Sequence, residues 1–183
     1  MAEGALIAVR NPPLLSVDVS ELLRRPGASD RVRIDPSLGG LRVPLAWVPE
    51  SEPLRAELLL EALVDGIHVT GVLAGEVTLE CRRCLREVVQ PMALELNDVF
   101  LYPGEADDDG EVYRVEGETI DLEPLIRDAV MLAMPLNPLC REDCKGLCTT
   151  CGADLNEVDC GHSQEPVDVR WTGLEQLRRS LEE

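Results

Sequence analysis

Cysteine clustering restricts the fold of this chain more than any other feature of its sequence. Seven cysteines, with one histidine close to the last of them, give eight soft metal ligands in three short segments. Two tetrahedral zinc sites need that number of side chains, so the pattern predicts a protein that binds two zinc ions. The candidate ligands are Cys81, Cys84, Cys140, Cys144, Cys148, Cys151, Cys160 and His162.

Two of the cysteine pairs have the Cys-x-x-Cys spacing of a metal-binding knuckle. At a tight turn this spacing lets both sulfurs point at one ion, while the amides of the turn stabilise thiolate charge. Cys81 and Cys84 form the first pair, and Cys148 and Cys151 form the second. Gly152 follows the second pair and supplies the left-handed conformation that such a turn often needs.

The remaining four ligands form two further half-sites. Cys140 and Cys144 are four residues apart, so on one helical turn after Pro138 they would face the same side. Cys160 and His162 are two residues apart, which in an extended segment also places both side chains on one face.

We weigh two combinations of these four half-sites. The shortest loop closure joins the 148/151 pair to the 160/162 pair in a compact ribbon, and leaves the 140/144 pair to meet the 81/84 pair. That second site would attach the C-terminal segment to a turn of the sheet. The alternative joins 140/144 to 148/151 and 81/84 to 160/162. Loop length favours the first combination.

Other interpretations of the cysteines compete with metal binding. Free cysteines are often small buried apolar residues, and a Cys-x-x-Cys pair can be a thiol redox centre. Redox pairs are typical of a helix start inside a βαβ unit, whereas residues 81–84 lie between predicted strands. The histidine and the local knuckles favour zinc over an iron–sulfur cluster, although the sequence leaves iron open.

No catalytic constellation accompanies these ligands. Eight ligands close both sites, so no coordination position is left for a substrate, as it is in a catalytic zinc site. The sequence also has no nucleophile-elbow, phosphate-loop or dinucleotide glycine motif. We therefore expect a non-enzymatic protein with no small-molecule substrate.

The charge balance excludes nucleic-acid binding by bulk electrostatics. The net charge is −18, from 35 acidic and 17 basic residues, and aromatic residues that could stack on bases make up only 3%. Contact with RNA would need a local basic patch. Arg82, Arg83 and Arg86 surround the first knuckle and are the candidates for RNA contact, and a second arginine cluster at residues 24–33 would extend the patch if folding joined the two.

The chain shows no targeting signal that we recognise. Its first residues, MAEGALIAVR, lack a charged segment followed by an apolar one, and no apolar run approaches the roughly 18 residues that span a bilayer. We expect a cytoplasmic protein without membrane contact. Reducing conditions there favour metal ligands over disulfides, and an odd number of cysteines agrees with that expectation.

Alternating apolar and polar residues predict a β-rich core. Residues 67–71, 72–80 and 88–100 have strand patterns, Asp65-Gly66 marks a hairpin turn, and the first knuckle lies at a turn between two strands. Short helices are predicted after Ser16, from Thr119 to Pro135, and from Trp171 to Leu181. The acidic run at 103–123 predicts a solvated loop.

The fold class that follows is α+β. We expect a mainly antiparallel β sheet of about four to six strands or a partly open barrel, with short helices and a C-terminal zinc-ribbon-like segment. Residues 1–135 would form a β-rich core domain with the N-terminal helix and the acidic loop. Residues 136–183 would form the Cys-rich metal-binding segment and the terminal helix.

Three stretches of the chain resemble the YceD family, the large ribosomal RNA subunit accumulation proteins. They are residues 17–23 with Pro26-Gly27, residues 79–85, and residues 138–156, of which Cys144 to Asn156 is the most specific. The resemblance implies a role in accumulation and processing of large-subunit ribosomal RNA. Relatives without the C-terminal ribbon keep ligands at the positions of 81, 84, 140 and 144, which supports the first pairing. Many relatives have cysteine where this chain has His162.

These observations lead to one functional hypothesis and two alternatives. The chain is predicted to be a zinc-binding factor in ribosome biogenesis that contacts precursor large-subunit rRNA, a ribosome assembly protein, or both. One alternative is a thiol redox protein or redox sensor that uses Cys81 and Cys84. The other is an acidic adaptor that holds basic ribosomal proteins through its acidic loop.

Overall fold

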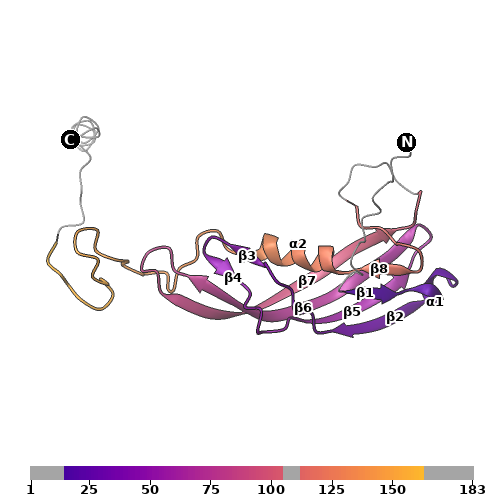
Figure 1. The fold of residues 1–183 in the computed structure, drawn as a ribbon, viewed down its shortest axis with the longest axis horizontal. Helices are drawn as coiled ribbons and strands as arrows, with labels where there is room; N and C mark the ends of the chain where they lie inside the picture. The colour runs from indigo at the N-terminus through magenta and orange to yellow at the C-terminus, as the bar shows by residue number, and fades with distance from the viewer. Residues whose placement is uncertain (1–14, 105–111, 163–183) are drawn as a thin grey trace, which may run out of the picture.

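The computed structural model describes residues 15–104 and 112–162 of the chain (Figure 1). Residues 1–14, part of the acidic run and the predicted helix from Trp171 to Leu181 lie outside the described residues. No described helix is both long enough and apolar enough to cross a membrane. The elements are β1 (Ser16–Asp18), α1 (Ser20–Leu23), β2 (Ser29–Ile34), β3 (Arg42–Val43), β4 (Ala46–Trp47), β5 (Arg55–Ala62), β6 (Gly66–Glu80), β7 (Glu87–Leu101), β8 (Thr119–Asp121) and α2 (Glu123–Ala133).

One six-stranded antiparallel sheet forms most of the described fold. Its strand order is β2-β5-β6-β4-β3, and β7 pairs with the other edge of β6. The two long strands, β6 and β7, have 15 residues each and pair from Gly66–Leu101 at one end to Glu80–Glu87 at the other. The prediction of a mainly antiparallel sheet is confirmed. The sheet is open rather than curled into a barrel, because β2 and β7 lie at opposite edges of the described strands.

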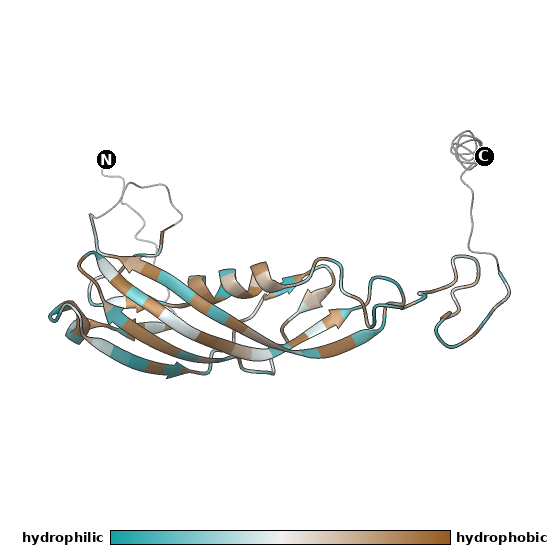
Figure 2. Ribbon diagram, turned by 180° about the vertical axis from the view of Figure 1, so that it is seen from behind, coloured by the Kyte–Doolittle hydropathy of each residue, from teal (hydrophilic) through white to brown (hydrophobic). Residues whose placement is uncertain are grey.

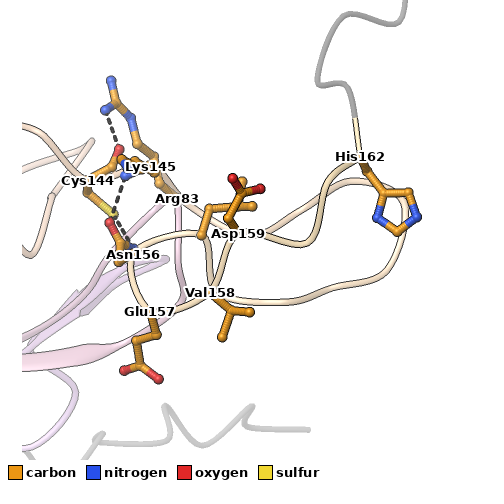
Figure 3. A pocket seen from close by; sticks show the side chains of 9 residues that line it. Arg83, Cys144, Lys145, Asn156, Glu157, Val158, Asp159 and His162 are labelled. Atoms are coloured by element: carbon orange, nitrogen blue, oxygen red, sulfur yellow. Dashed lines mark hydrogen bonds between the residues drawn. The ribbon is translucent and has the colours of Figure 1, made fainter.

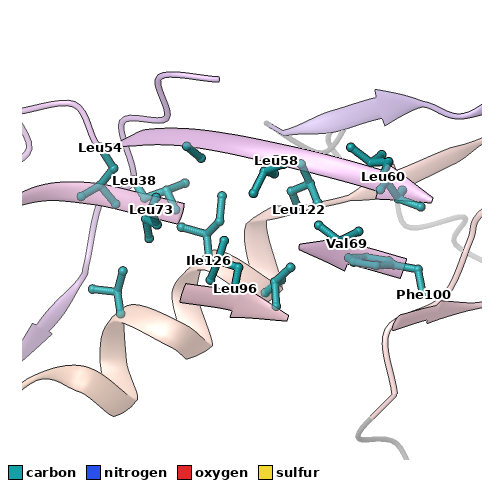
Figure 4. Close-up of a cluster of buried hydrophobic side chains, with 14 of the residues drawn as sticks. Leu38, Leu54, Leu58, Leu60, Val69, Leu73, Leu96, Phe100, Leu122 and Ile126 are labelled. Atoms are coloured by element: carbon teal, nitrogen blue, oxygen red, sulfur yellow. The ribbon is translucent and has the colours of Figure 1, made fainter. Parts of the chain in front are cut away.

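The core lies between one face of this sheet and helix α2 (Figure 4). Apolar residues alternate with polar ones along β5, β6 and β7, so the strands carry alternating hydrophobic and hydrophilic bands (Figure 2). Helix α2 contributes Ile126 and Val130, both with no exposed surface, to the same layer. The ring of Phe100 stacks on that of Tyr113, with the ring centroids 5.2 Å apart.

Two short strands occupy positions where helix was predicted. Residues Ser16–Asp18 pair with Thr119–Asp121 as the two-stranded sheet of β1 and β8, so the helix prediction is wrong for both segments. In each case an aspartate at the end of the strand fixes where the helix begins. The Ser20 N–H donates to Asp18 Oδ1 at 2.8 Å, and the Glu123 N–H donates to Asp121 Oδ1 at 3.0 Å. These bonds turn the chain after each strand, so each helix begins two residues after its aspartate and the preceding residues are free to pair.

The cysteine-rich segment lies beyond the tip of the long hairpin. Strands β6 and β7 are joined at residues 81–86, and α2 runs along the sheet toward the same end (Figure 1). Met134 has an extended conformation and Pro135 follows it, so the helix stops there and the chain continues to the hairpin tip. The hairpin and the segment after α2 therefore meet at one end of the molecule.

Candidate metal centres

The structure brings all eight predicted ligands together in two groups of four. Within each group the ligand atoms all lie within 4.8 Å of one another. The clamp cluster consists of Cys81, Cys84, Cys140 and Cys144, and the ribbon cluster consists of Cys148, Cys151, Cys160 and His162. These are the groups of the shorter-loop combination, and the alternative combination is not the one observed.

The sulfurs of the clamp cluster are spaced as a tetrahedral zinc site requires. Cys81 Sγ lies 3.8 Å from Cys144 Sγ, and Cys84 Sγ lies 3.6 Å from Cys140 Sγ. A zinc–sulfur bond of about 2.3 Å places the sulfurs of a tetrahedron about 3.8 Å apart. Cys81, Cys84 and Cys144 are buried, and Leu139 and Leu147 pack against them. The donor set and its spacing fit a zinc ion enclosed by protein.

The hairpin tip presents the first two of these sulfurs. The Cys81 N–H donates to Arg86 O at 2.9 Å, and the Leu85 N–H donates to Cys81 O at 2.8 Å, which closes the knuckle. Leu85 has a φ of +58°, in the left-handed region that a non-glycine side chain rarely adopts. Sequence reasoning placed the knuckle between two strands, and the structure confirms that position.

The second half of the clamp cluster is a turn and not the predicted helical turn. The Cys144 N–H donates to Arg141 O at 3.2 Å, and none of residues 137–147 is helical. Pro138 instead faces the hairpin, because its carbonyl accepts the Arg82 N–H at 3.0 Å. This hydrogen bond joins two segments that are far apart in the sequence, and it draws Cys140 toward the first knuckle. Local helical spacing could not have revealed this contact.

The ribbon cluster is built from local turns. The Cys148 N–H donates to Ala153 O, and the Gly152 N–H donates to Cys148 O, both at 2.8 Å. Gly152 has a φ of +73°, which confirms the left-handed position predicted for it. The ring of His162 closes the group, with its Nδ1 3.8 Å from Cys148 Sγ. These spacings also suit a tetrahedral zinc site, here with three sulfurs and one nitrogen.

Backbone amides around the knuckles favour thiolate charge on selected sulfurs. Burial opposes ionisation of Cys81, but the amides of Cys84, Cys140 and Arg83 outweigh it and lower the pKa of that thiol to about 6. Burial and the neighbouring thiols raise the pKa of Cys140 to about 12. In the ribbon cluster, the amides of Cys151 and Thr150 lower the pKa of Cys148 to about 6. Each cluster thus contains one cysteine whose lowered pKa favours the thiolate form that binds a metal cation.

Only three residues separate the two clusters along the chain. Lys145, Gly146 and Leu147 connect Cys144 to Cys148. The Leu147 N–H donates to Arg83 O at 3.0 Å, so the connection is bonded to the hairpin tip. Gly146 has a φ of +78°, and a Cβ there would lie 2.9 Å from Arg83 O. Glycine is therefore required at 146 both for its conformation and for this close approach.

Asn156 links the two clusters, and sequence reasoning did not assign it a role in the site. It lies in the loop that closes the ribbon cluster, yet its Nδ2 donates to Cys144 Sγ of the clamp cluster at 3.4 Å (Figure 3). Its Oδ1 accepts the Lys145 N–H and an Arg141 N–H, both at 2.8 Å. A single side chain from the ribbon thus orients a ligand of the clamp. The only signal in the sequence was the position of Asn156 at the end of residues 144–156, the stretch with the most specific family resemblance.

An open hollow of about 650 Å³ lies beside this link (Figure 3). Its lining mixes cations with carboxylates, because Arg83 and Lys145 face it together with Glu157 and Asp159. Mixed charge of this kind selects neither anions nor cations. We therefore assign no ligand to the hollow.

The three arginines predicted to contact RNA have partners within the protein. Arg82 Nη1 donates to Asn137 Oδ1 at 3.0 Å, and Arg83 Nη1 donates to Cys144 O at 2.7 Å. Arg86 forms ion pairs with Asp154 at 3.2 Å and with Glu157. Arg83 and Arg86 therefore hold the cysteine-rich segment against the hairpin tip.

The second arginine cluster does not join the first. Residues 24–33 belong to the turn after α1 and to β2, and β2 pairs with β5 beside the early part of β6. Through β5, Arg33 stands level with Val72, so eight residues of β6, or roughly 26 Å, separate it from the hairpin tip at Glu80. The condition for one continuous basic face, that folding joins the two clusters, is not met, because this length of β6 separates them.

Comparison with known proteins identifies relatives over most of the chain. Residues 69–178 match the family described as "Large ribosomal RNA subunit accumulation protein YceD". An uncharacterized protein of Mycobacterium tuberculosis is 39% identical over 171 residues, which cover 89% of this chain and 81% of that protein. An uncharacterized protein of Bacillus subtilis is 29% identical, covering 72% and 77% of the two chains.

A plant relative has a more informative name. The "Large ribosomal RNA subunit accumulation protein YCED homolog 1, chloroplastic" of Arabidopsis thaliana is 26% identical over 217 aligned positions, which cover 99% of this chain and 68% of that protein. No solved structure gives a significant match. The family match over residues 69–178 includes the hairpin tip and every ligand of both clusters.

Proposed function

This chain belongs to the YceD family of large ribosomal RNA subunit accumulation proteins, and from that premise we propose that it is a non-enzymatic zinc-binding factor in large-subunit rRNA accumulation. It would contact precursor rRNA, a ribosome assembly protein, or both. The family match over residues 69–178 is the observation that carries the proposal, because that region holds the hairpin tip and both ligand groups.

The zinc ions would have a structural role. Each cluster supplies four ligands, which fill a tetrahedral site and leave no open position for substrate. A zinc ion in the clamp cluster would attach the segment after α2 to the hairpin tip. A second ion in the ribbon cluster would order the loop that carries Asn156. The metals would thus fix a surface for recognition and would take no part in a reaction.

Among the predicted RNA contacts, Arg82 is the strongest candidate. Arg83 and Arg86 make contacts that hold the site together, so their loss would disturb the fold as well as any RNA contact. Arg82 is exposed and its side chain bonds only to Asn137 among the described residues. Its guanidinium could exchange that single bond for a phosphate.

A depletion experiment tests the proposed function. Removal of the gene is expected to lower the amount of mature large-subunit rRNA relative to small-subunit rRNA. The wild-type gene should restore the ratio, a Cys140→Ser/Cys144→Ser variant should fail to restore it, and Arg82→Glu should restore it poorly if the RNA contact is direct. An unchanged rRNA ratio after depletion would overturn the proposal.

The redox alternative requires that Cys81 and Cys84 be accessible to a partner thiol. A redox pair must be reached by its partner thiol, whereas these two side chains are only 1% and 7% exposed. The amides that lower the pKa of Cys81 serve a metal-bound thiolate equally well. Thiol alkylation of the purified protein separates the alternatives: a zinc scaffold should react only after chelation, and a redox pair should react in the metal-loaded protein.

A further inference from the structure

One face of the long hairpin is not covered by α2. Along β6 and β7 the inward residues enter the core, and the residues between them point to the other side of the sheet. Near the hairpin tip these outward positions carry mostly glutamates and small apolar residues. We call this surface the acidic sheet face, and its residues are Glu76, Glu80, Glu87, Val89, Pro91 and Glu95.

Two glutamates of this face lie where their charges lower the stability of the sheet. Glu80 and Glu87 are direct cross-strand partners, so two like charges stand opposite each other. Such pairs destabilise a sheet, and neither residue forms an ion pair within the part of the chain that the structure describes. Arg86, next to Glu87 in the sequence, is already paired with Asp154 and Glu157. Among the described residues, the facing carboxylates of Glu80 and Glu87 are therefore not neutralised by an ion pair.

Apolar surface lies at the centre of the acidic sheet face. Val89 is 58% exposed, and it stands opposite Thr78, which in turn stands opposite Trp47 of β4. Because facing residues of antiparallel strands share one side of the sheet, the three side chains form a row across it, in which Thr78 is buried and Val89 is exposed. The one cation in this row, Arg42, lies over the Trp47 ring at 5.1 Å. An apolar centre with a charged rim is the usual composition of a protein-binding surface.

A shallow hollow adjoins the row and is also mainly acidic. It has a volume of about 280 Å³, and two carboxylates, Glu52 and Glu76, line it with Pro91 and a single arginine, Arg55. The space is large enough for one long side chain. Its lining favours a cation that carries an aliphatic stem, as arginine and lysine side chains do.

The charge of this surface decides between the two kinds of partner named in the proposed function. RNA phosphates would be repelled by the carboxylates of Glu76, Glu80 and Glu87. We propose that the acidic sheet face binds an arginine- or lysine-rich segment of a protein, with apolar side chains of that segment against Val89 and Pro91. This inference rests on the proposed function and names the assembly-protein partner within it.

A charge-neutralising variant tests the proposal in the full-length, zinc-loaded protein. Glu80→Gln/Glu87→Gln removes the facing charges and preserves side-chain size, and Glu21→Gln/Asp65→Asn is the matched control at the other end of the sheet. The probe is a short synthetic peptide in which arginine and valine alternate. Binding is measured by calorimetry, and the contact surface is located by NMR shifts of backbone amides.

The expected result is weaker peptide binding together with greater stability. The Glu80/Glu87 variant should bind the peptide roughly three- to tenfold more weakly, as the loss of two exposed charge contacts implies. It should also unfold at higher urea concentration, because the like-charge pair is gone. The control should bind within about twofold of wild type, since its charges lie elsewhere. Amide shifts should map to β6 and β7.

Several outcomes would overturn the inference. Equal losses in the variant and its control would show that only overall charge matters, and shifts confined to other strands would place the contact elsewhere. Binding of single-stranded RNA at β6 and β7 would replace the protein partner with RNA. Failure here is distinct from failure of the proposed function, because the rRNA ratio after gene depletion does not depend on the peptide result.

Discussion

Asn156 offers the sharpest test of how the two metal centres depend on each other. Its amide donates to Cys144 Sγ of the clamp cluster, although the residue itself lies in the ribbon loop. We expect Asn156→Ala to weaken metal binding at the clamp cluster, which the side chain does not ligate. We expect Asn156→Asp to weaken it further, because a carboxylate cannot donate to sulfur and brings negative charge beside thiolates.

The magnitude follows from the bonds that the change removes. Alanine loses the N–H···S contact of 3.4 Å and the two bonds of 2.8 Å that Oδ1 accepts from Lys145 and Arg141. Each neutral hydrogen bond contributes about 1 kcal/mol net, and loss of a partner that orients a metal ligand typically costs 10- to 100-fold in affinity. We expect a decrease of roughly tenfold or more for Asn156→Ala at the clamp cluster.

Cobalt substitution gives an assay for each cluster. The thiolate-to-cobalt absorption band reports cysteine coordination, and competition with zinc and a chelator converts it to an affinity. A Cys148→Ser/Cys160→Ser background isolates the clamp cluster. Asn137→Ala is the matched control, because Asn137 accepts a bond from Arg82 at 3.0 Å beside the same knuckle but contacts no sulfur.

Two results would refute the reasoning. If Asn156→Ala leaves the clamp affinity within about twofold of wild type, the N–H···S contact does not position Cys144. If Asn137→Ala lowers the affinity as much, the effect comes from general loosening of the hairpin tip. In the first case the two clusters would bind metal independently, and in the second the link through Asn156 would not be specific.

Three further predictions concern the core, its pH dependence and the metals. Ile126→Ala should lower the free energy of unfolding by about 2–5 kcal/mol in urea titration, because the side chain has no exposed surface and α2 cannot close the cavity; a loss under about 1 kcal/mol would contradict this. Burial, followed by the bond to Asp128 Oδ2 at 2.7 Å, raises the pKa of Tyr113. The neutral phenol is thus favoured in the folded state, so its stabilisation is complete below the unfolded pKa of about 10 and is lost as pH rises through the folded value. Tyr113→Phe should cost about 1 kcal/mol at neutral pH and flatten the alkaline fall in stability; an unchanged alkaline slope would refute the assignment. Chelation should increase amide exchange in residues 139–160 far more than in α2, as measured by mass spectrometry, and equal exchange before and after chelation would exclude a structural metal.

The knuckles and the long hairpin could be predicted from sequence because their signals are local. The Cys-x-x-Cys spacing of Cys81 and Cys84 between two alternating segments placed the first knuckle at the β6–β7 turn. Gly152 marked the left-handed position of the second knuckle. In both cases a few neighbouring residues determine the geometry.

Features that depend on distant partners were not predictable in the same way. The short strands at Ser16 and Thr119 show no periodicity of their own and exist because they pair with each other across about a hundred residues of sequence. The Cys140–Cys144 turn takes its shape from the bond between Pro138 and Arg82. Asn156 acts across two clusters, so nothing in its own surroundings in the sequence indicated its contact with Cys144.

The clamp cluster joins positions that are far apart along the chain, and this makes a bound ion a reversible crosslink. Ligation of Cys84 and Cys140 would close a loop that contains β7, β8 and α2. For a loop of about 60 residues, closure removes enough freedom from the unfolded chain to favour the folded state by about 4 kcal/mol on the polymer estimate. The ribbon cluster closes only a short loop and gains less. Metal supply would therefore also add to the free energy of unfolding of the β-rich core, beyond ordering the segment that carries most of the ligands.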